Sequence, residues 1–180
     1  MLTRIIATKR EAIAARQGGH DLERQRAELE QLAAARTRGG FATSLRARGT
    51  RVIAEVKRQS PSAGVIAPES LDIITQATAY RDGGAAAISV LTDTPFFGGT
   101  LEDLAAIADA VPGVPLLRKD FLLDEFDLLQ SRAFGADAVL LITRILDDER
   151  LTSLIAEAAR LKLDVLVEVH DELEIARAIA

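Results

Sequence analysis

The sequence predicts an α/β fold in which helices cover a parallel sheet, and three observations support this prediction. Short apolar runs recur along most of the chain, stretches with helical spacing separate them, and glycines or helix-capping residues mark the junctions. Strands that are apolar on both faces, each followed by a helix, are typical of parallel sheets buried between helices. The spacing of the runs fits a barrel or a doubly wound sheet, so both arrangements stay open at this point.

Residues 1–48 are expected to form a helical extension that precedes the sheet. The apolar positions with helical spacing, first those of one helix and then those of a second, are Ile5, Ile6, Ile13, Ala14, Leu22, Leu29 and Leu32. Gly18 and Gly19 separate the two predicted helices, and Gly39 and Gly40 end the region. The segment 41–50 is interpreted as a link to the rest of the chain.

Residues 49–180 are expected to form the sheet and its covering helices. The predicted strands are RVIAEVK (51–57), AAAISVLT (85–92), PLLRKDF (115–121), ADAVLLIT (136–143) and LDVLVEVH (163–170). The predicted helices lie near 69–82, 100–111, 124–134 and 147–162, with a last one from Asp171. Thr100 and Asp103 fit a capping box at the start of one helix, and Gly83 and Gly135 stand where helices should stop.

The composition excludes several classes of function. The 180-residue chain has no cysteine, which excludes disulfides, thiolate metal sites and cysteine nucleophiles. Its two histidines, His20 and His170, are too few for a histidine-rich metal site. The net charge of -5 argues against a nucleic-acid partner, which needs a basic surface. No apolar run is long enough for a membrane span and the N-terminus is unlike a secretory signal, so a cytoplasmic protein is expected.

Charged residues inside the predicted strands indicate a candidate active site. Glu55 and Lys57 lie in the first strand, Lys119 in the third and Glu168 in the fifth, each towards the carboxyl end. Buried strand positions rarely carry unpaired charge, and parallel α/β sheets place their sites at the carboxyl ends of the strands. One such residue alone is more often a solvated rim residue or a simple ion pair. Four of them from three strands favour an active site.

The chemistry that these residues suggest is acid–base catalysis on a small anionic substrate. Two neighbouring lysines favour a carboxylate or phosphate ligand, and each makes the other lose a proton more readily, which prepares a general acid. The glutamates suit a general base or a support for the lysines. No phosphate-binding P-loop, GxGxxG pattern or nucleophile elbow is present.

Several segments resemble one family, the indole-3-glycerol phosphate synthases. IAEVKRQSPSAG (53–64) is similar to that family's first-strand signature, and GGAAAISVLTDTPFFG (83–98) to its second strand and loop. LLRKDF (116–121), ADAVLLI (136–142) and LVEVHDE (166–172) resemble the third, fourth and fifth strands, and TKREAIAAR (8–16) the N-terminal helix. The resemblance covers essentially the whole chain and implies a (β/α)₈ TIM barrel of which this chain holds about five units.

The resemblance also implies an activity and roles for residues. The family closes the ring of 1-(2-carboxyphenylamino)-1-deoxyribulose 5-phosphate, with loss of carbon dioxide and water, in tryptophan biosynthesis, and needs no metal or organic cofactor. Lys119 then corresponds to the general acid, Glu168 to the base, and Glu55 and Lys57 to catalytic first-strand residues, with Lys57 also suited to the substrate carboxylate. The implied substrate-binding residues are Ser60, Leu91, Phe97, Phe121 and Leu140. Plain core packing is the alternative for the apolar ones.

A complete barrel of this type takes about 250 residues, so the chain is expected to lack the last strands and the phosphate site that they carry. Three interpretations follow. The chain is this lyase, or a catalytically inactive fragment or assembly partner of it, or a related barrel such as phosphoribosylanthranilate isomerase, which does not require the Glu55, Lys57 and Lys119 set. Open edges at the first and fifth strands predict self-association.

Overall fold

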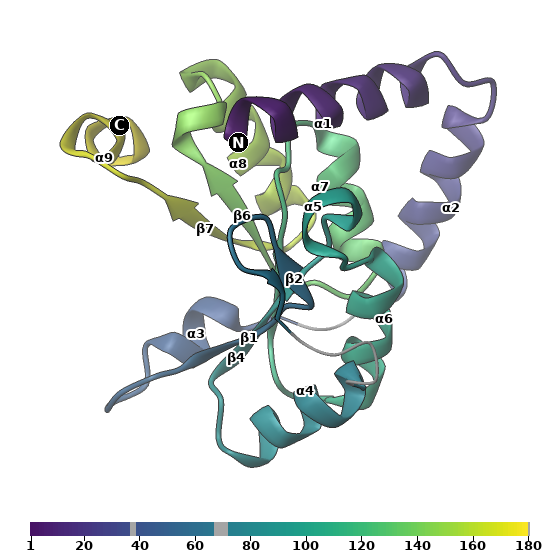
Figure 1. Ribbon diagram of the computed structural model, residues 1–180. Coiled ribbons are helices and arrows are strands. Elements are labelled where there is room, and N and C mark those ends of the chain that lie inside the picture. The colour runs from purple at the N-terminus through teal and green to yellow at the C-terminus, as the bar shows by residue number, and fades with distance from the viewer. Residues whose placement is uncertain (37–38, 67–71, 180) are drawn as a thin grey trace.

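The computed structural model describes residues 1–36, 39–66 and 72–179, and a five-stranded parallel sheet forms its centre (Figure 1). The strands, in their order across the sheet, are β1 (Ile53–Val56), β4 (Ala87–Leu91), β5 (Leu116–Lys119), β6 (Ala138–Ile142) and β7 (Asp164–Glu168). This order follows the chain, whereas a doubly wound sheet reverses at a switch point. The sheet therefore has the strand order of a (β/α) barrel, with five consecutive βα units, as the sequence predicted.

Helices follow the strands at the predicted places and cover the outer face of the sheet. They are α4 (Ile73–Asp82), α6 (Leu101–Ala110), α7 (Glu125–Ala133), α8 (Asp148–Arg160) and α9 (Glu172–Ile179), with the 3-10 turn η1 (Thr143–Ile145) before α8. Thr100 and Asp103 form the predicted capping box of α6, and Asp124 and Asp127 form a second one on α7. The part of the first predicted helix at 69–71 lies outside the described residues.

The N-terminal extension forms two helices, α1 (Leu2–Gln17) and α2 (Leu22–Ala35), as predicted. Helix α2 packs on α7, and α1 runs across the carboxyl end of the sheet, where Lys9 meets residues that follow β4 and β5 (Figure 1). The buried side chains of α1 are Ile5 and Ile6. No helix in the described ranges is long and apolar enough to cross a bilayer.

Four short elements, in addition to η1, were not predicted. Residues 41–50, interpreted as a link, contain helix α3 (Phe41–Leu45). Strands β2 (Gln59–Ser60) and β3 (Gly64–Val65) form an antiparallel hairpin after β1, and α5 (Thr94–Phe97) follows β4. Helix α3 exists because Phe41 buries its ring, 3% exposed, against Ala87 and Leu117 on the inner face of the sheet.

The apolar core has two parts, on opposite faces of the sheet. The larger part lies between the sheet and the outer helices and includes the fully buried Ile88, Leu104 and Leu116. Each such side chain stabilises the fold by about 1.5–3 kcal/mol through its removal from water. The smaller part, around Phe41, fills the inner face towards the amino ends of the strands. Towards the carboxyl ends of the strands, the inner face carries the charged side chains of Glu55, Lys119 and Glu168.

Candidate active site

Three of the four predicted catalytic residues line one cavity at the inner face of the sheet. Register pairs Glu55 with Ser89 across β1 and β4, Leu91 with Lys119 across β4 and β5, and Ile142 with Glu168 across β6 and β7. Alternation along each strand turns these side chains inwards. The cavity has a volume of about 430 Å³, and Glu55, Lys119 and Glu168 lie in its wall with Leu117, Leu140 and Leu166.

Glu55 contacts both predicted lysines through its two carboxylate oxygens. Lys57 Nζ lies 2.5 Å from Glu55 Oε1, and Lys119 Nζ lies 3.2 Å from Glu55 Oε2. Partial burial would raise the pKa of Glu55, but the hydrogen bond from Lys57 and the charge of Lys119 lower the pKa below its ordinary value. The carboxylate is therefore ionised at neutral pH and fixes both ammonium groups.

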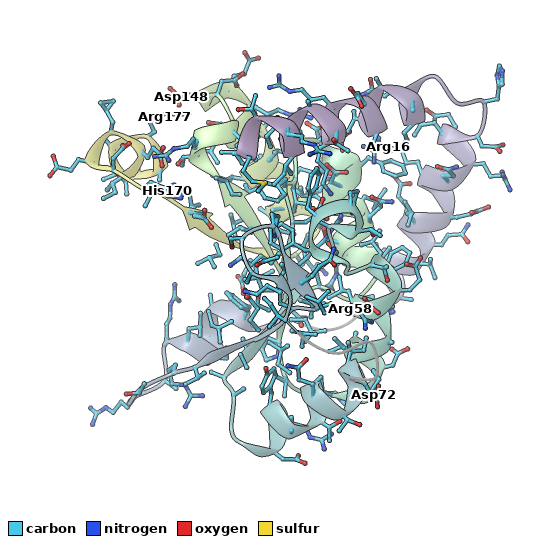
Figure 2. All side chains as sticks on the ribbon, in the orientation of Figure 1. Arg16, Arg58, Asp72, Asp148, His170 and Arg177 are labelled. Carbon is cyan, nitrogen blue, oxygen red and sulfur yellow. The ribbon has the colours of Figure 1, made fainter. Side chains whose placement is uncertain are left out.

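Lys57 is connected to the cavity by its ion pair with Glu55. Strand β1 ends at Val56, and Lys57 does not contribute to the wall of the cavity. The loop that follows is tied to α6 instead, because Arg58 Nη2 donates to Asp103 Oδ1 at 2.7 Å (Figure 2). The prediction that Lys57 belongs with Glu55 agrees with the distance, whereas a direct role of Lys57 at the substrate stays a prediction.

Glu168 lies at the end of β7, and its carboxylate contacts a residue outside the predicted set. His170 Nε2 is 3.2 Å from Glu168 Oε1, and His170 Nδ1 is 3.2 Å from Glu174 Oε2 (Figure 2). Burial would raise the pKa of Glu174, but hydrogen bonds from Arg144, the His170 backbone N–H and Thr143 lower it to about 2. The ionised carboxylate of Glu174 thus contacts Nδ1 of His170, while the opposite ring nitrogen, Nε2, contacts Glu168.

A second, more apolar cavity adjoins the first. It has a volume of about 260 Å³, and all four predicted apolar binding residues line it: Leu91, Phe97, Phe121 and Leu140. The ring centroids of Phe97 and Phe121 are 6.2 Å apart, with the rings inclined at 37°. Lys119 and Glu168 line both cavities. A planar aromatic group in the second cavity would therefore lie beside an amino group and a carboxyl group.

Ser60, the fifth predicted binding residue, lies outside both cavities. It is on β2, and its Oγ accepts a hydrogen bond from the Ala63 N–H at 3.1 Å. The contact stabilises the turn between β2 and β3. A substrate-binding role for Ser60 stays a prediction.

A buried arginine behind the site was missed from the sequence. Arg118 is 4% exposed and donates to Thr92 Oγ1 at 2.9 Å, Asp120 Oδ2 at 2.9 Å and Ser131 Oγ at 3.0 Å. Its side chain points to the outer face, opposite to Lys119, because neighbours in a strand alternate. The signal in the sequence was an arginine inside an apolar strand, which demands a partner such as Asp120.

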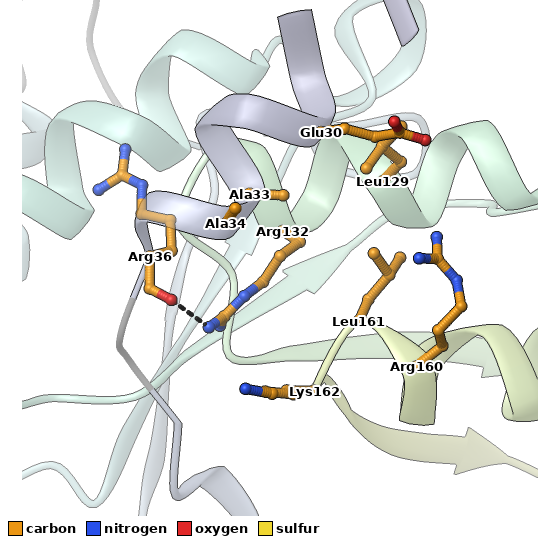
Figure 3. A pocket seen from close by; sticks show the side chains of 9 residues that line it. All are labelled: Glu30, Ala33, Ala34, Arg36, Leu129, Arg132, Arg160, Leu161 and Lys162. Atoms are coloured by element: carbon orange, nitrogen blue, oxygen red, sulfur yellow. Dashed lines mark hydrogen bonds between the residues drawn. The ribbon is translucent and has the colours of Figure 1, made fainter. Parts of the chain in front are cut away.

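A third cavity, of about 350 Å³, lies between α2, α7 and the turn before β7 (Figure 3). Its wall is basic, but its arginines already bind protein groups. Arg132 donates to the Arg36 carbonyl at 2.7 Å, and Arg160 pairs with Glu157 at 2.7 Å. This cavity therefore offers less for an anion than the inner face does.

Comparison with known proteins assigns the family. Residues 2–180 match the family model described as indole-3-glycerol phosphate synthase. Proteins named indole-3-glycerol phosphate synthase are 47% identical in Desulfosudis oleivorans, over 96% of this chain and 65% of that protein, and 45% identical in Roseiflexus castenholzii, over 100% of this chain and 68% of that protein. The relative in a Nocardioides species is 53% identical over 75% of this chain and 51% of its own length. The chain spans about two thirds of the length of the first two relatives. The family model and these relatives agree, and the chain belongs to the indole-3-glycerol phosphate synthase family.

Proposed function

We propose that the chain acts as a carbon–carbon lyase that converts 1-(2-carboxyphenylamino)-1-deoxyribulose 5-phosphate to indole-3-glycerol phosphate in the cytoplasm. The single observation that supports this most is the position of Lys119. Its ammonium group pairs with Glu55, and Lys119 lines both the first and the second, more apolar cavity. Glu168 also lines both cavities. An aromatic anion that needs a proton on one oxygen and loses a proton later fits this arrangement.

The proposed reaction divides between the two cavities. The aromatic ring lies against Phe97 and Phe121, and its carboxylate is compensated by a lysine. A new bond forms between the ring carbon that carries the carboxylate and the ketone carbon, while Lys119 gives its proton to the ketone oxygen. Carbon dioxide then leaves and its electron pair returns to the ring. Lys119, reprotonated from solvent, gives a second proton to the new hydroxyl group, which leaves as water, while Glu168 removes a proton from the adjacent carbon of the new ring and so completes the indole.

Turnover of that substrate tests the proposal directly. We expect the purified 180-residue chain to form an indole product, followed by the appearance of indole fluorescence at neutral pH. A chelator is included in a parallel reaction, and it should leave the rate unchanged because the proposed steps use only side chains. Absence of product at high protein concentration would rule out catalysis by this chain alone.

A second candidate is a non-catalytic fragment or assembly partner of the same enzyme. The observation that favours it lies at the sheet edges, where β1 pairs with β4 alone and β7 with β6 alone among the described strands. Helix α9 beside β7 exposes Leu173 and Ile179, at 72% and 81%. Edge strands with nearby apolar side chains favour association with another chain. The proposed partners are thus a small anionic substrate and a second copy of the chain, with neither nucleic acid nor membrane.

A further inference from the structure

Lys9 on helix α1 contacts the loops at the carboxyl ends of two strands. The Lys9 ammonium group lies 2.6 Å from Asp120 Oδ1 and 3.0 Å from Asp93 Oδ1. Asp93 is the second residue after β4, and Asp120 directly follows Lys119 at the end of β5. One lysine of the N-terminal extension therefore joins the two loops that frame the apolar cavity.

The two carboxylates depend on the charge of Lys9. Only 1% of each side chain is exposed, compared with 22% for Lys9. A buried carboxylate is costly unless an opposite charge compensates it. Burial would raise the pKa of Asp120, but Arg118 and Lys9 together hold it far below its ordinary value. Without Lys9, two buried negative charges would share the single positive charge of Arg118 in this network.

Each carboxylate fixes the loop that carries one aromatic residue of the cavity. Asp120 Oδ1 accepts a hydrogen bond from the Phe121 backbone N–H at 2.8 Å. Asp93 Oδ2 accepts one from the Phe96 backbone N–H at 3.1 Å and so caps α5, which contains Phe97. Both aspartates also line the cavity themselves. Lys9 thus binds the two aspartates, and the aspartates in turn fix the backbone of the loops that carry the Phe97 and Phe121 rings.

A second contact keeps α1 docked independently of Lys9. Arg16 lies two helical turns further along the same face of α1. Its guanidinium group is 2.5 Å from Asp124 Oδ2 and 3.2 Å from Asp127 Oδ1, and it lies 4.3 Å from the centre of the Phe126 ring (Figure 2). Removal of the Lys9 charge should therefore loosen the two loops without detaching the helix.

We propose that Lys9 is a positioning residue for the apolar cavity, because its bridge between the two loops holds Phe97 and Phe121 at their mutual spacing. The bridge also neutralises two carboxylates in the cavity wall that would otherwise repel an anionic substrate. This second consequence rests on the proposed function, whereas the first does not. The N-terminal extension is thereby a part of the binding site, although none of its described side chains lines either inner cavity.

Hydrogen–deuterium exchange of the 180-residue chain tests the positioning without any need for turnover. Lys9→Met keeps the stem of the side chain and removes its charge. We expect amide exchange at 92–98 and 120–124 to rise about tenfold or more, with β6 unchanged, because local opening is specific to the loops that lose a contact. Lys9→Arg should restore protection, since a guanidinium group can also bridge two carboxylates.

Arg24→Met is the matched control, because Arg24 is an exposed cation of the N-terminal extension whose ion pairs, with Asp21 and Glu28, lie far from both loops in the sequence and involve neither of them. Equal exchange in wild type and Lys9→Met, or an increase spread evenly over the chain, overturns the positioning role.

The effect of Lys9 on substrate binding is measured separately, by steady-state kinetics. We expect the KM of Lys9→Met to rise about tenfold with a much smaller change in kcat, and an unchanged KM with loosened loops refutes the effect on the substrate. If the loops loosen while no form of the chain turns over substrate, Lys9 positions the loops and the proposed catalysis fails.

Discussion

Glu55 binds two lysines at once, and the geometry gives the two lysines different tasks. Lys57 Nζ lies 2.5 Å from one carboxylate oxygen and outside the cavities, whereas Lys119 Nζ lies 3.2 Å from the other oxygen and lines both cavities. Lys119 is therefore the lysine that can reach a substrate atom while its charge is still compensated. Lys57 instead donates a hydrogen bond to Glu55 and thereby lowers the pKa of that carboxyl group.

Replacement of Lys119 by methionine should remove the acid while keeping the fold. General acid catalysis typically contributes about 10²–10⁴-fold, so we expect the single-turnover rate with the carboxyphenylamino substrate to fall by that factor. Circular dichroism should stay unchanged, since Lys119 is partly exposed. Lys162→Met, at the opposite end of the sheet, serves as the control. A near-wild-type rate in Lys119→Met would transfer the role of acid to Lys57.

The alternation of strand side chains accounts for the three predicted charged residues that line one cavity, and the two predicted residues that lie outside the cavities do so for a physical reason. Glu55, Lys119 and Glu168 lie inside strands, where a period of two fixes the face. Lys57 and Ser60 lie beyond the end of β1, where the chain turns into a hairpin and alternation no longer applies. Lys9 could not be found this way, because its partners are more than 80 residues away in the sequence and no local pattern encodes that contact.

Among the helices, α9 is held to η1 and to the start of α8 largely by charged and hydrogen-bonded side chains. Glu174 accepts hydrogen bonds from Thr143 and Arg144, and Arg177 donates to the carbonyl groups of Thr143 and Leu146 and to Asp148 (Figure 2). Its apolar residues Leu173 and Ile179 are exposed instead. The docking of this helix should therefore respond to pH more than that of α6 or α7.

Acid should release α9 before the rest of the chain unfolds. The pKa of Glu174 is lowered from 4.5 to about 2 in the folded chain, so its stabilising effect is complete above about pH 4.5 and is lost as the pH falls towards 2. We expect the amide exchange protection of α9 to decrease over this range while β5 and β6 remain protected. In Glu174→Gln the protection of α9 should be low at neutral pH already. A wild-type α9 that stays protected at pH 2.5 would contradict this account.

The long elements were predictable from the sequence, and the short ones were not. Five strands and seven helices follow from apolar runs, helical spacing and caps such as Thr100 with Asp103. Helix α3 depends on the burial of Phe41 in the inner face, and α5 on a cap by Asp93 that Lys9 supports. These elements are too short for a periodic pattern, and tertiary contacts stabilise them.

For the molecule as a whole, the sheet has two free edges, β1 and β7. Their outer backbone N–H and C=O groups have no strand partner among the described residues. We expect the purified chain to associate in a concentration-dependent manner, which light scattering after size exclusion would show. A double change, Leu173→Lys with Ile179→Lys, should weaken association through α9, whereas edge pairing alone would be unaffected. A monodisperse monomer at about 100 µM would refute the prediction, since strand-edge association is driven by concentration.

The inner face of this open sheet also leaves the proposed proton-transfer groups accessible to solutes. Lys119 is 41% exposed and Glu168 36% exposed on the inner face, so small molecules from the buffer can reach the place of either side chain. Lys119→Ala would leave a hole of about the size of a primary amine. We expect added methylamine or ethylamine to restore part of the lost rate, in proportion to its concentration and according to the acidity of the ammonium ion, as Brønsted behaviour requires. Lys119→Met, in which the hole is filled, should not respond. A site that accepts its acid from solution in this way would show that the chain supplies the position of the proton donor and that the chemistry needs only an ammonium ion held there.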